Sequence, residues 1–227
     1  MIFVFDCDGV LVDSEIIAST VDAEHLAEIG YKITPEEVSR RFAGLTSRGI
    51  GDIIAAEIGR PLPENFFQKT RVDIDRRLAT DLKEVPGASA LIDRLAGERK
   101  CVCSNSSMER LRISLQKTEL LDRLAPHIYS AVEVGNKQPK PDPNVYLYAA
   151  AAFGIDPREA VVLEDSVFGV GAAKRAGMRV VGFTGGSHSW PGHADLLNEA
   201  GAETVIKRLA DFPAIAEAVM SWEGLPE

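Results

Sequence analysis

Short apolar runs alternate with longer helical patterns along most of this 227-residue chain, and this alternation limits the fold more than any other feature. The apolar runs predict strands at 2–5, 100–103, 127–131, 160–163 and 179–183, and amphipathic stretches predict helices at 88–96, 108–115, 145–153 and 167–176. Strands separated by helices are typical of βαβ units in a mostly parallel sheet. We therefore expect an α/β fold with helices on both faces of the sheet. Its ligand site should lie beyond the carboxyl ends of the strands.

One long segment interrupts the alternation. Residues 15–83 show helical periodicity and no convincing strand. Within this segment Thr34 and Pro35, followed by two glutamates, predict a helix start, because Thr caps a helix, Pro suits its first turn and acids favour its N-terminus. Pro86 and Gly87 mark the return to the alternating pattern. We expect residues 1–14 and 84–227 to form the α/β core and residues 15–83 to form an inserted helical cap.

Composition and charge exclude several classes of partner. The net charge of −9 at pH 7 argues against nucleic acid, because such binding depends on clustered Lys and Arg. No apolar run approaches the ~20 residues of a membrane-spanning helix, and the apolar stretch at residues 1–5 is too short for a signal-peptide core. The three cysteines favour a reduced environment. We therefore expect a cytoplasmic, monomeric enzyme that acts on a small molecule.

Two acids follow the first predicted strand. Asp6 and Asp8 lie two residues apart, and Gly9 then allows a sharp turn of the backbone. Like charges crowded at a strand end need a cation to offset them, and carboxylate oxygens are ligands that Mg²⁺ prefers. The motif alone is equally compatible with an acidic loop that caps a helix.

A second acidic pair follows the fourth predicted strand. Glu164 and Asp165 end the apolar run at 160–163, on the side of a parallel sheet where ligands bind. Asp165 is therefore a candidate ligand of the same ion as Asp6. The alternative is that Asp165 only caps the helix that begins near Val167.

Two polar segments lie between these acidic pairs. Residues 104–107, beginning with Ser104 and Asn105, offer hydroxyl and amide groups ahead of a helix N-terminus, where anions are favoured. The same residues would also serve as a helix cap. Lys140 lies among three prolines at 139, 141 and 143, and a rigidly held lysine can neutralise charge on a transferring phosphoryl group. The alternative is an ordinary surface lysine.

Together these motifs resemble one protein family. In order and approximate spacing they are similar to the haloacid dehalogenase superfamily, and the cap after the first strand resembles its phosphatase branch, which contains β-phosphoglucomutases and sugar-phosphate phosphatases. Residues 6–15 are especially similar to bacterial sugar-phosphate and 6-phosphogluconate phosphatases. The resemblance covers nearly the whole chain. It rests on four motifs, which are Asp6-x-Asp8-Gly9, Ser104, Lys140-Pro141-Asp142-Pro143 and Glu164-Asp165-Ser166-x-x-Gly169.

The resemblance implies a Rossmann-like core and a magnesium-dependent phosphatase that attacks small phosphorylated metabolites. It implies that Asp6 is the nucleophile, which forms a transient aspartyl-phosphate, and that Asp6 also binds the metal. By the same resemblance, Asp8 is the general acid and base, and its backbone carbonyl contacts the metal. Proton transfer by such a residue contributes roughly 10²–10⁴-fold to the rate.

The resemblance also assigns roles around the phosphoryl group. It implies that Ser104 hydrogen-bonds the phosphoryl oxygens with help from Asn105, and that Lys140 pairs with both the nucleophile and the phosphoryl group. Asp165 is an implied magnesium ligand, and Glu164 binds the metal through water or supports its ligands. These roles suit phosphoryl transfer, which depends on positioning and charge neutralisation.

The first alternative function is a phosphosugar mutase. The mutases of this branch carry an additional histidine about ten residues beyond the second Asp, where this chain has Ala18, and the nearest histidine is His25. Their cap loop carries an Arg, and the matching Arg48 here is displaced by one place. Hydrolysis is therefore the preferred interpretation, and dehalogenation is disfavoured because the Asp8 acid and base has no purpose there.

Two alternatives come from other classes of protein. A dinucleotide-binding turn at 169–174 lacks its third glycine, because Lys174 stands there, and the adjacent acids would repel a pyrophosphate. A phospho-receiver module also combines acids, a hydroxyl and a lysine. Such modules are small and uncapped, so the 69-residue insert argues against this interpretation.

Two further regions carry expectations from the sequence. Residues 44–48 are the expected specificity loop, with Gly44 and Arg48 as substrate-binding candidates and Arg48 facing a second anionic group. His188 and His193 flank residues 189–192, and we interpret them as part of a solvated loop rather than a metal pair.

Overall fold

The computed structural model of the chain describes residues 1–42, 45 and 47–222. Its centre is a six-stranded sheet with the order β3-β2-β1-β4-β5-β6, in which every neighbouring pair is parallel. The strands are β1 (Ile2–Phe5), β2 (Lys100–Ser104), β3 (Ile128–Ser130), β4 (Ala160–Glu164), β5 (Arg179–Phe183) and β6 (Thr204–Ile206). The predicted parallel α/β fold and all five predicted strands are confirmed.

The register of β1 explains why the acidic strand ends meet. Phe3 pairs with Lys100 of β2 on one side and with Val161 of β4 on the other. Because β1, β2 and β4 are adjacent and parallel, their carboxyl ends open at the same edge of the sheet. All four residues of β1 are buried, as expected for a central strand covered on both faces.

Alternate strand residues enter two separate apolar layers. Phe3 and Phe5 pack with the helices α5 (Ala88–Arg94), α6 (Met108–Lys117), α7 (Leu121–Leu124) and α11 (Phe212–Ser221). Ile2 and Val4 point to the opposite face, where α8 (Asn144–Phe153), α9 (Val167–Arg175) and α10 (His193–Glu199) cover the sheet. Short 3-10 helices span Pro157–Glu159 and Leu209–Asp211. The period of two in the strands therefore produces the expected three-layer arrangement.

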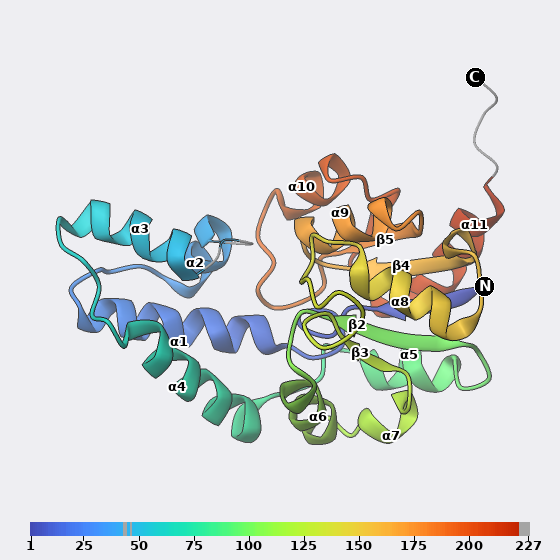
Figure 1. The fold of residues 1–227 in the computed structure, drawn as a ribbon, viewed down its shortest axis with the longest axis horizontal. Coiled ribbons are helices and arrows are strands. Elements are labelled where there is room, and N and C mark those ends of the chain that lie inside the picture. Colours follow the sequence, from blue (N-terminus) through green and yellow to red (C-terminus); the bar gives the residue numbers. More distant parts are fainter. Residues whose placement is uncertain (43–44, 46, 223–227) are drawn as a thin grey trace.

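Four helices lie to one side of the sheet, where Figure 1 shows them as a separate group. They are α1 (Ser14–Glu28), α2 (Pro35–Phe42), α3 (Ser47–Ile58) and α4 (Phe66–Asp81), and they share an apolar cluster of their own. The predicted helix start at Pro35 is confirmed, since Thr34 Oγ1 accepts from the Glu37 backbone N–H at 3.2 Å. The Glu37 carboxylate in turn accepts from the Thr34 backbone N–H at 2.9 Å.

The chain leaves and re-enters the sheet region along two adjacent segments. The backbone N–H of Asp13 donates to the carbonyl of Lys83, and that of Val85 donates to the carbonyl of Leu11, each at 3.0 Å. The two connections to the helical group are therefore held side by side. The division into a core of residues 1–14 and 84–227 and a cap of residues 15–83 stays a prediction, and the position of α1–α4 supports it.

Candidate active site

A cavity of about 1230 Å³ lies between the acidic edge of the sheet and the four cap helices. Core residues that follow β1, β2 and β4 line one side of it, and residues of α1, α2 and α4 line the other. No helix in the described part of the chain has the length and hydrophobicity needed to cross a bilayer.

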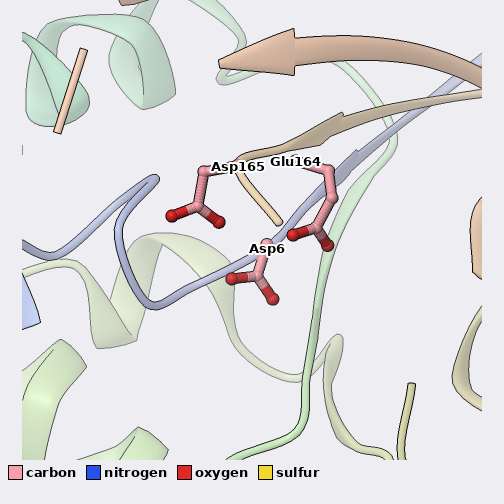
Figure 2. A group of neighbouring side chains, drawn as sticks. All are labelled: Asp6, Glu164 and Asp165. Atoms are coloured by element: carbon pink, nitrogen blue, oxygen red, sulfur yellow. The ribbon is translucent and has the colours of Figure 1, made fainter. Parts of the chain in front are cut away.

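Three buried carboxylates converge beside this cavity, and two of them, Asp6 and Asp165, line it. Asp6 directly follows β1, Glu164 ends β4 and Asp165 follows it, and Figure 2 shows their carboxyl groups gathered in one region. One oxygen of each lies within 4.8 Å of the other two. Burial and the neighbouring carboxylate of Glu164 raise the pKa values of Asp6 and Asp165 well above their ordinary range. This donor set of buried oxygens fits a hard divalent cation, which would offset the repulsion.

Glycine is required at the turn beside these carboxylates. Gly9 has φ +78°, a conformation that other residues rarely adopt. A Cβ atom at this position would overlap Oδ2 of Asp165. The sharp turn expected from the sequence therefore also lets the loop after β1 pass close to the end of β4.

Lys140 supplies the positive charge among these acids. Its Nζ donates to Oδ1 of Asp6 at 2.6 Å and to Oε2 of Glu164 at 2.7 Å, and its side chain is only 3% exposed. Burial alone would lower the pKa of Lys140, but Asp6 and Glu164 outweigh this effect and hold it well above its ordinary value. Burial also favours a neutral Glu164, but the charge of Lys140 holds the pKa of Glu164 below its ordinary value. The surface-lysine alternative is wrong.

Asp8 is held by three hydroxyl groups. Ser14 donates to its Oδ1 at 2.8 Å, while Ser104 and Ser106 donate to its Oδ2 at 3.1 Å and 2.8 Å. Asp8 is not part of the group of three converging carboxylates among the described residues. Ser104 is among the residues predicted from the sequence, whereas Ser14 and Ser106 were given no role there. The sequence spacing of Ser14 and Ser106 from Asp8 does not indicate these hydrogen bonds. Ser14, for example, reaches Asp8 from the first turn of α1.

The capping alternative for residues 104–107 is confirmed at Ser107 and is wrong for Ser104, and the capping alternative for Asp165 is wrong as well. The residue that caps α6 is Ser107, whose side chain accepts from the Arg110 backbone N–H. The residue that caps α9 is Ser166, which accepts from the Gly169 backbone N–H. Asp165 and Ser104 are therefore available to the cavity, which both of them line.

Asn105 ties two loops of the site together. Its Oδ1 accepts from the backbone N–H of Lys140 at 2.7 Å, and its Nδ2 donates to the carbonyl of Lys140 at 3.2 Å. Both ends of the amide thus fix the loop that carries the lysine. Asn105 also lines the cavity, and its proposed contact with phosphate stays a prediction.

The two late histidines are buried, so the interpretation as a solvated loop is wrong. His188 Nε2 lies 3.0 Å from Oδ2 of Asp165, and His193 Nε2 lies 2.8 Å from the backbone carbonyl of Asp165. Trp190 stacks on His193 with ring centroids 4.3 Å apart and an interplanar angle of 8°. Burial lowers the pKa values of both histidines. They therefore hold Asp165 in place, and both also line the cavity.

Two described residues of the expected specificity loop, Leu45 and Ser47, line the cavity. Gly44 lies outside the described residues. Arg48 is exposed, and the arginines that line the cavity among the described residues are Arg40, Arg71 and Arg110. A contact between Arg48 and substrate stays a prediction.

Comparison with known proteins identifies the family. Residues 3–183 match the family described as haloacid dehalogenase-like hydrolase. The 6-phosphogluconate phosphatase of Escherichia coli (strain K12) is 32% identical over 188 residues, which cover 82% of this chain and 84% of that protein. A phosphorylated carbohydrates phosphatase of Thermotoga maritima is 33% identical over 210 residues, covering 90% and 93%.

Solved structures give the same result. A conserved haloacid dehalogenase-like protein of unknown function from Agrobacterium tumefaciens has a TM-score of 0.91 at 48% identity, covering 96% of this chain and 97% of that chain. A haloacid dehalogenase family hydrolase from Deinococcus radiodurans, with bound phosphate and sodium, has a TM-score of 0.83 at 32% identity and covers 96% of both chains. These matches confirm the family and fold expected from the motifs, and the chain is a haloacid dehalogenase-like hydrolase.

Proposed function

We propose that this protein is a magnesium-dependent phosphatase that hydrolyses small phosphorylated carbohydrates through an aspartyl-phosphate on Asp6. The observation that carries the proposal is the buried contact of Lys140 with Asp6 and Glu164, beside a cavity that the cap helices line on its other side. The two phosphatases described above act on phosphorylated sugars or sugar acids by name, which supports this substrate class. A cytoplasmic, monomeric enzyme is part of the same proposal.

The metal would be held by the side chains of Asp6 and Asp165, with Glu164 binding or supporting it and the Asp8 carbonyl as a further ligand. A bound Mg²⁺ supplies positive charge against the phosphoryl oxygens. The three carboxylates converge, and burial and the charge of Glu164 raise the pKa values of Asp6 and Asp165, which supports such a site. Nucleophilic attack, proton transfer and the remaining charge neutralisation are carried out by side chains of this protein.

The first step is attack by a carboxylate oxygen of Asp6 on phosphorus. The bond from phosphorus to the ester oxygen breaks, and protonated Asp8 gives its proton to the departing alcohol. Lys140 remains beside Asp6 and neutralises charge on the phosphoryl group, while Ser104 hydrogen-bonds one of its oxygens. A carboxylate nucleophile divides hydrolysis into two easier steps.

The second step returns the enzyme to its starting state. Asp8 takes a proton from a water molecule, and the water oxygen attacks phosphorus, so that the bond between phosphorus and Asp6 breaks. Phosphate leaves, and Asp8 is protonated again for the next cycle. The hydroxyl groups of Ser14 and Ser106 hold the Asp8 carboxylate at the cavity wall between these transfers.

The residues that line the cavity do not favour the mutase or the receiver alternative. Ala18 lines the cavity at the position where the mutases of this branch carry a histidine, so it offers no imidazole to the second phosphoryl group. A receiver module needs no substrate cavity beside its phosphorylated Asp.

The test is phosphate release from a panel of 6-phosphogluconate, glucose 6-phosphate, glycerol 3-phosphate and phosphoglycolate, with Mg²⁺ and with EDTA. Release that depends on Mg²⁺ and favours a few carbohydrate phosphates supports the proposal. Conversion of glucose 1-phosphate to its isomer without release would replace it with the mutase. A label from acetyl phosphate that persists for minutes, with no turnover, would replace it with a receiver.

A further inference from the structure

Tyr146 is a fully buried polar residue beside the site that the proposed mechanism does not use. It lies in the first turn of α8, which follows the loop that carries Lys140. Its hydroxyl donates to Oε2 of Glu164 at 2.8 Å, and the same oxygen accepts from Lys140 Nζ at 2.7 Å. This Nζ also lies 5.0 Å from the centroid of the Tyr146 ring, a distance at which an aromatic face attracts a cation. Tyr146 therefore contacts both members of the buried ion pair between Lys140 and Glu164.

The carboxylate of Glu164 has its acceptor positions occupied by donors of the protein. Its Oε1 accepts from the backbone N–H of Ser166 at 3.0 Å and from the hydroxyl of Ser166 at 2.8 Å. Its Oε2 accepts from Lys140 and Tyr146. A carboxylate offers about four lone-pair positions, and these four donors fill them. A metal ion bound directly to Glu164 would have to displace one of these donors.

The surroundings of Glu164 also separate it from the cavity. Its side chain is 1% exposed, and the described residues that line the cavity include Asp6 and Asp165 but not Glu164. On its other side the first turn of α9 lies against the carboxyl group, because a Cβ atom at Gly169 would overlap the carboxyl carbon of Glu164. The carboxylate of Glu164 is therefore enclosed by the protein, where it contacts Lys140.

The proposed reaction gives this arrangement a purpose. When Asp6 attacks phosphorus, its carboxylate becomes part of the aspartyl-phosphate, so Glu164 remains as the full negative charge that holds Lys140. A lysine ammonium is a point charge on a flexible stem, and it keeps its place only if its partner is fixed. Accurate placement matters, because a shift of ~1 Å can reduce a rate by about 10²-fold.

We propose that Tyr146 is a positioning residue, which fixes the carboxylate of Glu164 and thereby holds the Lys140 ammonium at Asp6 during both steps. Glu164 then serves Lys140 and is not a direct ligand of the metal. This inference rests on the proposed phosphatase function and decides between the two roles that this function leaves to Glu164.

The experiment removes one hydroxyl group. Tyr146→Phe deletes the donor to Glu164 and keeps the ring beside Lys140. With enzyme in excess over the best carbohydrate phosphate of the panel, the single-turnover rate should fall by about 10-fold, the effect of one hydrogen bond to a charged group. KM should change by less than about threefold, because the buried Tyr146 does not touch the substrate. The matched control is Tyr148→Phe, which removes the same hydroxyl from a tyrosine of α8 that is 41% exposed and should change neither quantity.

A double-mutant cycle tests whether Tyr146 acts through Glu164. Glu164→Gln should slow turnover by itself, and Tyr146→Phe should add less than about twofold in that variant, because the acceptor of its hydrogen bond has lost the charge. Urea unfolding shows for each preparation that the protein is folded. The inference is overturned if the two changes are fully additive. It is also overturned if Tyr146→Phe lowers stability but keeps the single-turnover rate, since the role would then be structural only.

Calorimetric titration with Mg²⁺ tests the role of Glu164 without turnover. Asp165→Asn should weaken Mg²⁺ binding at least about 10-fold more than Glu164→Gln does, because only the former removes a direct ligand. Tyr146→Phe should leave the Kd for Mg²⁺ within about twofold of the wild type. Equal losses in Asp165→Asn and Glu164→Gln would place Glu164 among the metal ligands and overturn its assignment to Lys140.

The two proposals fail in different ways. A wild type that hydrolyses carbohydrate phosphates at a rate that Tyr146→Phe does not change overturns the role of Tyr146 alone. A wild type that releases phosphate from no member of the panel overturns the phosphatase function itself.

Discussion

The acidic edge of the sheet and the four cap helices carry their charges in opposite ways. At the edge, the side chains of Lys140, Asp6 and Glu164 are 3%, 10% and 1% exposed. In the cap, the pair Arg41 and Glu57 is 38% and 42% exposed. The same residue types are thus desolvated in one region and solvated in the other.

This difference determines what each region contributes. A buried charge is costly unless it is paired, so charges at the sheet edge are tolerated only as a mutually dependent set. Exposed ion pairs contribute little to stability, because water and salt screen them. We infer that the buried charges at the sheet edge take part in the reaction. Most charges of the cap are solvated surface groups, and the exceptions are those that line the cavity.

Asp6→Asn should show the largest effect of any single change at the sheet edge. Without a nucleophilic carboxylate, phosphate release should fall by at least about 10³-fold. Stability without metal should be unchanged or higher, because burial and Glu164 already raise the pKa of Asp6 and an amide removes this repulsion. Phosphate release and thermal unfolding in EDTA test both statements. Activity comparable to the wild type would eliminate Asp6 as the nucleophile.

Lys140→Met should destabilise the fold more than any exposed substitution. Asp6 and Glu164 would lose the hydrogen bonds from their common cation, and removing one partner of a buried charge set costs about 3–5 kcal/mol. Urea unfolding without metal measures this change. Lys137→Met, an exposed lysine on the same loop, is the control and should change stability by less than about 0.5 kcal/mol. Similar effects of the two variants would contradict the contrast between buried and exposed charges.

The same contrast explains which features the sequence could predict. Asp6 and Asp165 could be predicted because each follows a strand, and Lys140 because it lies in a rigid loop. A parallel sheet brings the carboxyl ends of its strands together, and this does not depend on the surrounding side chains. The helix start at Pro35 was predicted for a similar reason, since capping is a local property. These features depend on a few neighbouring residues.

Features that depend on distant contacts were missed. β6 is a three-residue edge strand with only Ile206 fully buried, so its apolar pattern is too short to distinguish it from a helix. His188 and His193 lie among Gly, Ser and Pro, a composition typical of loops, and both contact Asp165, which is distant in the sequence. In the cap, the rotation of α1 decides that Glu15 lines the cavity, and helical periodicity did not assign it a role.

Asp22→Asn should change how stability depends on pH, because this cap acid is partly buried beside the cavity. Burial raises its pKa from 3.8 to about 6, so between these values the folded state keeps a proton that the unfolded state has released. The contribution of Asp22 to the stability of the wild type should therefore fall as pH rises from about 4 to 6 and stay level above that. The variant should lack this decrease and be more stable at pH 7 by about 1–2 kcal/mol, after allowing for partial exposure.

Urea unfolding at pH 4, 5, 6 and 7 measures this difference. The control is Glu24→Gln, an exposed acid on the same helix that pairs with Arg77. It should leave the shape of the pH profile unchanged. Parallel profiles for Asp22→Asn and the wild type would show that Asp22 is solvated like the other charges of the cap.

Asp75→Asn should have the smallest effect, although Asp75 joins the cap to the core. It accepts from Arg110 of α6, and this pair is 28% and 47% exposed. An exposed pair of this kind contributes about 0.2–1 kcal/mol, so urea unfolding should show a change no larger than that. KM for a carbohydrate phosphate is the more sensitive measurement, because Arg110, which lines the cavity, loses its anchor.

A change in KM without a change in stability would mean that this contact positions Arg110 rather than stabilising the fold. The control is Asp93→Asn, which removes an exposed partner of Arg123 away from the cavity and should alter neither quantity. A loss of several kcal/mol in Asp75→Asn would contradict the contrast between the two regions, because an exposed pair would then behave like the buried set around Lys140. Desolvated charges would in that case extend from the floor of the cavity to the contact between α4 and α6.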